Sequence, residues 1–175
     1  MQDHEDFQLG ANPASSRAAA PPVTVRAARA APDRLFFLLE SSATMRVRHR
    51  WDLVSSSVRK FVNWDAPAGA RVGIGHFGAG YRTDRPLTTV PESLMGRGEL
   101  VNLPPVADDV QEGQKSWRQA VDGALNALGA EAAGAILFWV TGNGNSSSVM
   151  PTREDVQYMI RVLREKQVRV IHTSR

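Results

Sequence analysis

Unbroken apolar runs mark the strands that the sequence predicts. Residues 35–39 and 136–140 are continuous apolar runs, typical of strands that are buried on both faces of a parallel sheet. Residues 70–77 and 168–171 have the composition of two more strands, and residues 82–90 that of a short edge strand.

Apolar residues with helical spacing lie between these strands. Residues 47–61 carry apolar side chains at steps of four, three, four and three, which is typical of one helix face: Val47, Trp51, Val54, Val58 and Phe61. Residues 117–128 show a second helical pattern, a third runs from Thr152 to Leu163, and a short helix is expected within residues 92–101. Strands that alternate with helices predict an α/β fold with a doubly wound, mostly parallel sheet flanked by helices, of the general Rossmann-like kind.

The composition fits one folded domain and excludes several classes of site. The chain has 175 residues, 42% of them hydrophobic and 22% charged, which is usual for a globular protein of about one domain. Because it has no cysteine, disulfides, thiolate metal sites and cysteine nucleophiles are excluded. The net charge of +3 is a mild excess without a polybasic tract, so we expect no nucleic-acid partner. No apolar run approaches the ~20 residues of a membrane helix, so we expect no membrane insertion.

The two ends differ from the middle of the chain. Residues 1–32, rich in Ala, Pro, Ser and Arg, are predicted to be a linker or extended lead-in, and their polar, acidic start does not match a signal peptide. Residues 33–175 are predicted to form the domain. Because the last apolar strand has nothing after it, we expect a fragment of a longer protein whose domain lacks its last elements.

One glycine pattern is a poor fit to the function that it suggests. Residues 73–78 match the dinucleotide fingerprint G-x-G-x-x-G, but that motif needs its glycines between a strand and a helix. Here Gly73 and Gly75 fall inside a predicted strand, and no helical pattern follows. A nucleotide-binding α/β protein is therefore the least favoured alternative. No nucleophile–base pair, carboxylate dyad or HExxH motif is present, so the chain is predicted not to be an enzyme.

The first strand and the loop after it resemble the opening of a von Willebrand factor A (VWA) domain. Residues 35–45 read LFFLLESSATM, where that family has a strand followed by Asp-x-Ser-x-Ser, the core of its metal-ion-dependent adhesion site, or MIDAS. Residues 71–77 resemble the family's second strand, residues 112–117 fall at its Gly-Gly-Thr turn, and residues 138–144 fall at the strand that ends Thr-Asp-Gly. The resemblance covers about residues 33–175.

Within that superfamily, the chain most resembles the A domain of the calcium-activated chloride channel regulators. An arthropod member of that family is the narrower resemblance. Residues 4–7 (HEDF), the Pro-rich lead-in and residues 99–104 (ELVNLP) carry this narrower likeness. It implies a non-catalytic protein-interaction domain of a secreted or cell-surface protein, with a chloride channel or another extracellular protein as partner. Asn145 begins a glycosylation sequon, which suits an extracellular location.

The resemblance also implies a set of site residues. In the family, hydroxyls of the first loop, a threonine of the second loop and an aspartate after the fourth strand organise a divalent ion, whose open position takes an acidic side chain of the partner. Ser42 and Thr44 retain the two hydroxyls. Glu40 stands for the first aspartate, Lys115 for the threonine and Gly142 for the second aspartate.

These replacements predict a degenerate site without metal and no cofactor. A unit positive charge 4 Å from a divalent ion costs about 8 kcal/mol at an effective dielectric constant of 20. Weak binding of Mg²⁺ or Ca²⁺ by Glu40, Ser42 and Thr44, as in a metal-dependent adhesion module, is the alternative. Two positions of Lys115 stay open: its ammonium pairs with Glu40, or it points into solvent. Residues of the two later loops are the interaction candidates: Lys115, Gly142 and Asn143.

Several other residues are assigned structural roles. His76 is predicted to be a hydrogen-bonded core histidine. Three tryptophans are assigned to the core: Trp51, Trp117 and Trp139. Three arginines form either a basic patch or a solvated helix face: Arg46, Arg48 and Arg50.

Overall fold

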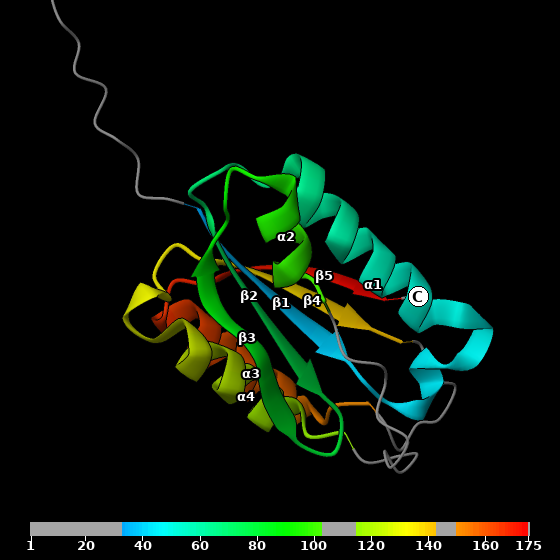
Figure 1. Cartoon of the computed structure of the whole chain (residues 1–175). Coiled ribbons are helices and arrows are strands. Elements are labelled where there is room, and N and C mark those ends of the chain that lie inside the picture. The colour runs from blue at the N-terminus through cyan, green and yellow to red at the C-terminus, as the bar shows by residue number, and fades with distance from the viewer. Residues whose placement is uncertain (1–32, 103–114, 143–149, 175) are drawn as a thin grey trace, which may run out of the picture. The chain divides into compact units, whose positions relative to one another are not determined.

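The computed structural model describes residues 33–102, 115–142 and 150–174. Its centre is one five-stranded sheet in the order β3-β2-β1-β4-β5 (Figure 1). The strands are β1 (Arg34–Glu40), β2 (Arg71–Phe77), β3 (Tyr81–Thr89), β4 (Ile136–Thr141) and β5 (Arg169–Ser174). Four strands are parallel, and β3 runs antiparallel at one edge. The predicted doubly wound, mostly parallel α/β sheet is confirmed.

Helices cover both faces of this sheet, which explains the unbroken apolar run of β1. Helices α1 (Arg50–Lys60) and α2 (Leu94–Leu100) lie on one face, and α3 (Trp117–Leu128) and α4 (Arg153–Glu165) on the other (Figure 1). Successive side chains of a strand point to opposite faces. Leu35, Phe37 and Leu39 accordingly pack in the core under α1, whereas Phe36 and Leu38 pack under α3 and α4.

The first predicted helix is partly wrong. Short 3₁₀ turns, η1 (Ala43–Met45) and η2 (Val47–His49), precede α1, and His49 has a left-handed φ of 56°. This residue breaks the helical spacing, so Val47 leaves the apolar face and is 52% exposed. At its other end α1 continues into one turn of π-helix, η3 (Phe61–Asp65).

The later helices follow their sequence signals closely. Helix α3 spans the predicted residues, and a 3₁₀ turn, η4 (Gly129–Glu131), follows it. Thr152 caps α4, because its side chain accepts a hydrogen bond from the Asp155 N–H while the Asp155 carboxylate accepts one from the Thr152 N–H. Such a reciprocal capping box satisfies two otherwise unpaired donors of the first turn.

The glycines of the G-x-G-x-x-G pattern serve packing. A Cβ on Gly73 would lie 2.6 Å from the Phe36 ring, and one on Gly75 would lie 2.8 Å from the Tyr81 ring. After Gly78 the chain bends back into β3 and forms no helix. The helix N-terminus that a dinucleotide pyrophosphate needs is therefore missing at this motif.

Within the described ranges, no helix is both long enough and apolar enough to cross a membrane.

Candidate functional site

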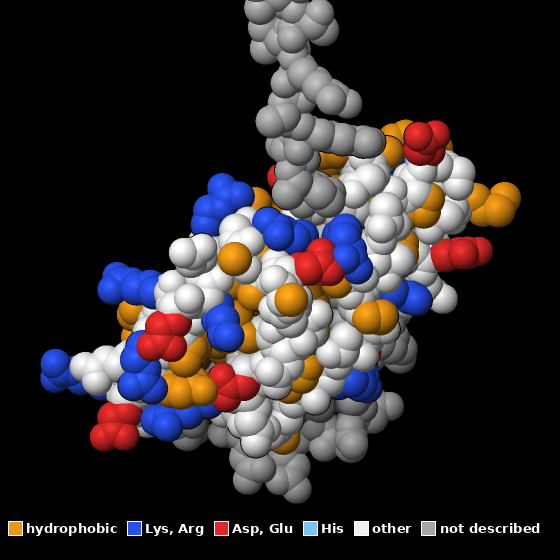
Figure 2. Space-filling view, turned by 90° about the vertical axis from the view of Figure 1, so that its left-hand side faces the viewer, with side chains coloured by type: hydrophobic (Ala, Val, Ile, Leu, Met, Phe, Trp, Pro, Cys, Tyr) orange, Lys and Arg blue, Asp and Glu red, His pale blue; other side chains and the backbone are white. Residues whose placement is uncertain are grey.

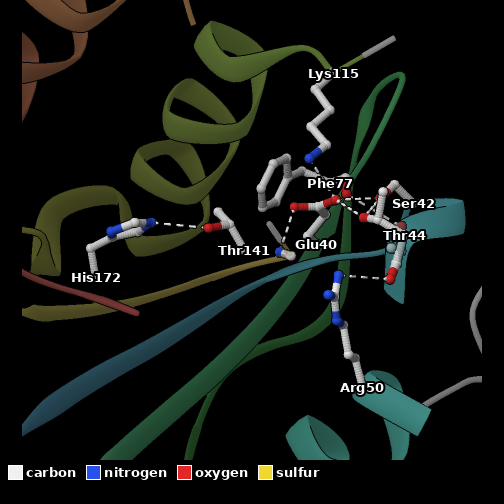
Figure 3. Close-up of polar contacts among 10 residues, drawn as sticks. Glu40, Ser42, Thr44, Arg50, Phe77, Lys115, Thr141 and His172 are labelled. Atoms are coloured by element: carbon white, nitrogen blue, oxygen red, sulfur yellow. Dashed lines mark hydrogen bonds and ion pairs between the residues drawn. The ribbon is translucent and has the colours of Figure 1, made fainter. Parts of the chain in front are cut away.

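Three loops and the start of α3 converge at the carboxyl edge of the parallel strands. Backbone hydrogen bonds hold them there: the Ser41 N–H donates to the Phe77 carbonyl at 2.8 Å, and the Ser116 N–H donates to the Gly78 carbonyl at 2.8 Å. In doubly wound sheets this edge is where ligands bind. The fold brings together the predicted site residues of the described part: Glu40, Ser42, Thr44, Lys115 and Gly142 (Figure 3).

The Glu40 carboxylate is fully buried and accepts four donors. Its Oε1 accepts hydrogen bonds from the Ser42 hydroxyl and, at 2.8 Å, from the Thr44 hydroxyl, and it pairs with the Lys115 ammonium at 2.7 Å. Its Oε2 accepts the Gly142 N–H at 2.9 Å (Figure 3). A carboxylate offers about four lone-pair directions. Three of the four donors converge on Oε1, and Oε2 accepts one.

Lys115 supplies the positive charge of the site from within the protein. Its side chain is only 4% exposed, so of the two positions left open by the sequence the structure has the one paired with Glu40. The ammonium also lies 5.5 Å from the centre of the Trp117 ring, within the range of a cation–π contact. Burial of two charges is favourable only when they are paired and hydrogen-bonded, as they are here.

Gly142 stands where a metal site has its second aspartate, and a side chain there would require Thr44 to shift. A Cβ at this position would lie 2.9 Å from Thr44 Oγ1 and 3.1 Å from Met45 Sδ. The residues present are a poor fit to a divalent cation, because the site has a single carboxylate that already accepts four donors, one of them an ammonium. Elsewhere in the described ranges, no three His, Asp or Glu side chains gather closely enough to hold an ion. Asn143 and Asn145 lie outside the described residues.

The structure adds an acidic partner for His76 that sequence reasoning missed. His76 is 3% exposed, its Nδ1 contacts the Asp84 carboxylate, and its ring lies 4.9 Å from that of Trp51. The Asp84 charge is offset by Arg82, whose Nε lies 2.7 Å from Oδ1. Burial, with a smaller repulsion from Arg82, lowers the pKa of His76 to about 4. The signal for this contact was the β2–β3 pairing, which sets His76 opposite Arg82 and so puts Asp84 two residues further along the same face.

The tryptophans and arginines singled out in the sequence can now be placed. Trp51 and Trp139 are buried as predicted, whereas Trp117 is half-buried. Arg50 donates to the Thr44 carbonyl at 3.4 Å and so ties α1 to the site loop, and Arg46 is exposed (Figure 3). The side chain of Arg48 is not among those described.

Comparison with known proteins places the fold. No family model and no curated protein matches the chain. Among solved structures, a von Willebrand factor type A protein from Catenulispora acidiphila aligns with a TM-score of 0.57 at 14% identity, over 82% of this chain and 33% of that one. Proximal thread matrix protein 1 of the mussel byssus, in a form with a zinc-occupied MIDAS motif, aligns with a TM-score of 0.57 at 16% identity, over 82% and 38%. The chain has a VWA fold.

A third neighbour gives the same result. The conserved hypothetical protein BatB from Bacteroides thetaiotaomicron aligns with a TM-score of 0.59 at 14% identity, over 80% of this chain and 65% of its own. The chain thus spans between one third and two thirds of the length of these three proteins. Identities this low establish the shared fold, and function has to be argued from the site.

Proposed function

We propose that this chain is a non-catalytic protein-interaction domain of the VWA type, in which the Lys115 ammonium takes the place of the divalent cation. The supporting observation is the Glu40 carboxylate, whose oxygens are occupied by three neutral donors and one ammonium. A metal ion at Oε1 would have to displace one of these donors, and at either oxygen it would face the charge of Lys115. The Lys115 ammonium thus acts as a built-in cation, which joins the loops of the site through Glu40.

The proposal extends to the protein's setting by resemblance. The likeness of residues 4–7 and 99–104 to calcium-activated chloride channel regulators supports a secreted or cell-surface protein, with a chloride channel or another extracellular protein as partner. Nucleic acid is a poor partner for the surface in Figure 2, where basic and acidic side chains lie among one another. No catalytic role and no cofactor are proposed.

A thermal-shift titration tests the built-in cation. A ligand that binds only the native state raises the melting temperature by mass action, so Mg²⁺, Ca²⁺ and Zn²⁺ are expected to leave the melting temperature of the wild-type chain unchanged from that in chelator. Saturable stabilisation by any of these ions would overturn the proposal.

A variant series supplies the positive control. The combination of Glu40→Asp, Lys115→Thr and Gly142→Asp rebuilds the carboxylates and hydroxyl of a metal site, and Mg²⁺ is expected to stabilise it. Gly142→Asp alone is expected to lower the melting temperature, because its Cβ forces Thr44 aside. A triple variant that stays blind to Mg²⁺ would mean that these loops do not correspond to those of the metal site.

A metal-dependent adhesion module is the second candidate. The hydroxyls of Ser42 and Thr44 lie 2.7 Å apart beside Glu40, an arrangement of oxygens that a hard cation uses. The zinc-occupied neighbour supports the same idea for a protein with this fold. If Mg²⁺ or Ca²⁺ stabilises the wild-type chain and Ser42→Ala removes the effect, this candidate replaces the first.

A further inference from the structure

A cavity of about 440 Å³ opens directly beside the Glu40–Lys115 pair. Helix α4 and the carboxyl ends of β4 and β5 form its walls, and Lys115 and Gly142 belong to both the cavity and the site. Its volume lies in the range of pockets that receive ligands or anchoring side chains. Any molecule that docks on the site also meets this cavity.

The lining is mainly apolar, and part of it is exposed. Six side chains dominate: Trp117, Trp139, Met150, Met159, Ile160 and Val170. Met150 is 67% exposed, Ile160 44% and Val170 40%. Ile160 of α4, Val170 of β5 and Met150 before α4 thus present apolar surface to solvent around the cavity. Apolar surface gathered in this way marks a binding surface more often than scattered apolar residues do.

The polar groups of the wall define the chemistry of an occupant. Thr141 Oγ1 and His172 Nε2 are hydrogen-bonded to each other at 3.0 Å, and the Lys115 charge is neutralised by Glu40 (Figure 3). The Trp139 indole nitrogen has no hydrogen-bond partner among the described residues, but the atom itself is buried and is not open to an occupant. The charge of the described wall is thus neutralised within the protein. An uncharged apolar group fits this wall, whereas a carboxylate finds no free counter-charge.

We propose that this cavity receives an uncharged apolar side chain, such as Leu or Phe, from the partner polypeptide. The inference rests on the proposed interaction function and deepens it. A VWA site that holds a metal ion binds an acidic residue of the partner, but here Glu40 already neutralises the Lys115 ammonium. Affinity must then come from burial of an apolar anchor in a preformed pocket, as at the centre of many protein interfaces.

Methionine methyl NMR tests this with reporters that the chain already contains. Met150 and Met159 line the cavity, Met45 lies beside Gly142, and Met95 on α2 is 82% exposed outside the cavity lining. The probes are the N-acetyl amides of leucine, phenylalanine and aspartate. The two apolar probes are expected to shift the Met150 and Met159 signals saturably and to leave Met95 unchanged. The aspartate probe should bind at least tenfold more weakly.

A matched pair of variants distinguishes binding in the cavity from nonspecific binding to exposed apolar surface. Ile160→Lys places a charge in the cavity wall. Leu53→Lys is the matched change on α1: Leu53 is 52% exposed and lines a different groove, on the other face of the sheet. Ile160→Lys should abolish the response of Met150 and Met159, and Leu53→Lys should preserve it.

Four results would overturn the inference: equal binding of the aspartate probe, a Met95 response as large as that of Met159, an unaltered response in Ile160→Lys, or no saturation by any probe. Dimerisation in sedimentation that Ile160→Lys abolishes would also overturn it, because a second copy would then fill the cavity. Titration of the same sample with Mg²⁺ keeps the two proposals apart. A Met45 shift would contradict the metal-free site and leave the cavity result standing.

Discussion

At the scale of single residues, the buried pair of Lys115 and Glu40 holds the candidate site together. The carboxylate receives donors from the loop after β1, from the residue after β4 and from the start of α3. Such a cluster is stable only as a whole, because each donor lowers the cost of burying the charge. The pair is therefore the most sensitive point at which to test the site.

Lys115→Met is expected to lower the free energy of unfolding by about 3–5 kcal/mol, because it leaves the Glu40 charge buried without a counter-charge. Adding Glu40→Gln should recover more than half of this loss, since the amide oxygen still accepts the Gly142 N–H and the rotatable hydroxyls can accept from the amide nitrogen. Urea unfolding measures both variants. Lys60→Met, at an exposed lysine of α1, serves as the control and should stay within about 0.5 kcal/mol of wild type. A loss below about 1 kcal/mol in Lys115→Met would mean that the ammonium is not buried against Glu40.

His76 predicts how stability depends on pH. Its pKa falls from 6.5 to about 4 on folding, because burial and, to a smaller extent, Arg82 disfavour the imidazolium more than the Asp84 contact favours it. Between these values the unfolded chain binds a proton that the folded chain does not. Stability should therefore be complete above pH 6.5 and decline as the pH falls toward 4, by up to about 3 kcal/mol at 1.36 kcal/mol for each pKa unit. Unfolding titrations of wild type and His76→Gln at several pH values measure the difference. Parallel curves for the two proteins would exclude His76 as the cause.

At the scale of elements, one arginine of the short helix α2 caps the end of the first long helix. Arg97 is 8% exposed and donates from Nη1 to the carbonyls of Val62 at 3.1 Å, Asn63 at 3.3 Å and Ala66 at 2.8 Å. Its Nε donates to the Pro91 carbonyl at 2.8 Å. The last carbonyls of a helix lack partners within the helix and carry partial negative charge, so a guanidinium fork satisfies several at once. This contact joins α2 to η3.

Arg97→Met should keep the packing of the side-chain stem and lose the cap. Leaving these carbonyls without a partner is expected to cost about 3 kcal/mol of unfolding free energy. Arg59→Met is the matched control, because Arg59 is exposed and makes one carbonyl contact, to Val101 at 3.3 Å. Chemical denaturation of both variants measures the contrast. Equal losses would show that the carbonyl cap of η3 contributes nothing measurable.

At the scale of the whole sheet, the sequence predicted the parts that depend on periodicity. The unbroken apolar run of β1 and the helical spacing of α3 are patterns among residues close together in the sequence. Both elements lie where these patterns predicted them. The helix predicted to begin at Val47 was misplaced because the left-handed backbone of His49 leaves no mark in the apolar spacing.

The site was only partly predictable for a related physical reason. The loop of Glu40, Ser42 and Thr44 could be found from side-chain identities and resemblance. The fourth donor to Glu40 is the Gly142 backbone N–H, which every residue type except proline carries, so no sequence pattern announces it. The cavity likewise depends on how α4 lies against β4 and β5.

The outer edge of β5 gives a prediction about aggregation of this chain. Among the described strands β5 pairs only with β4, and Val170 and Ile171 on its two faces are 40% and 50% exposed. An apolar edge strand can pair with other chains, and natural proteins often block such edges with lysine. Ile171→Lys is therefore expected to raise the temperature at which light scattering appears on heating, with little change in unfolding free energy. Val47→Lys, at a residue 52% exposed and away from the sheet edge, is the control. If both variants delay scattering equally, the added charge alone is responsible and β5 is not the aggregation route.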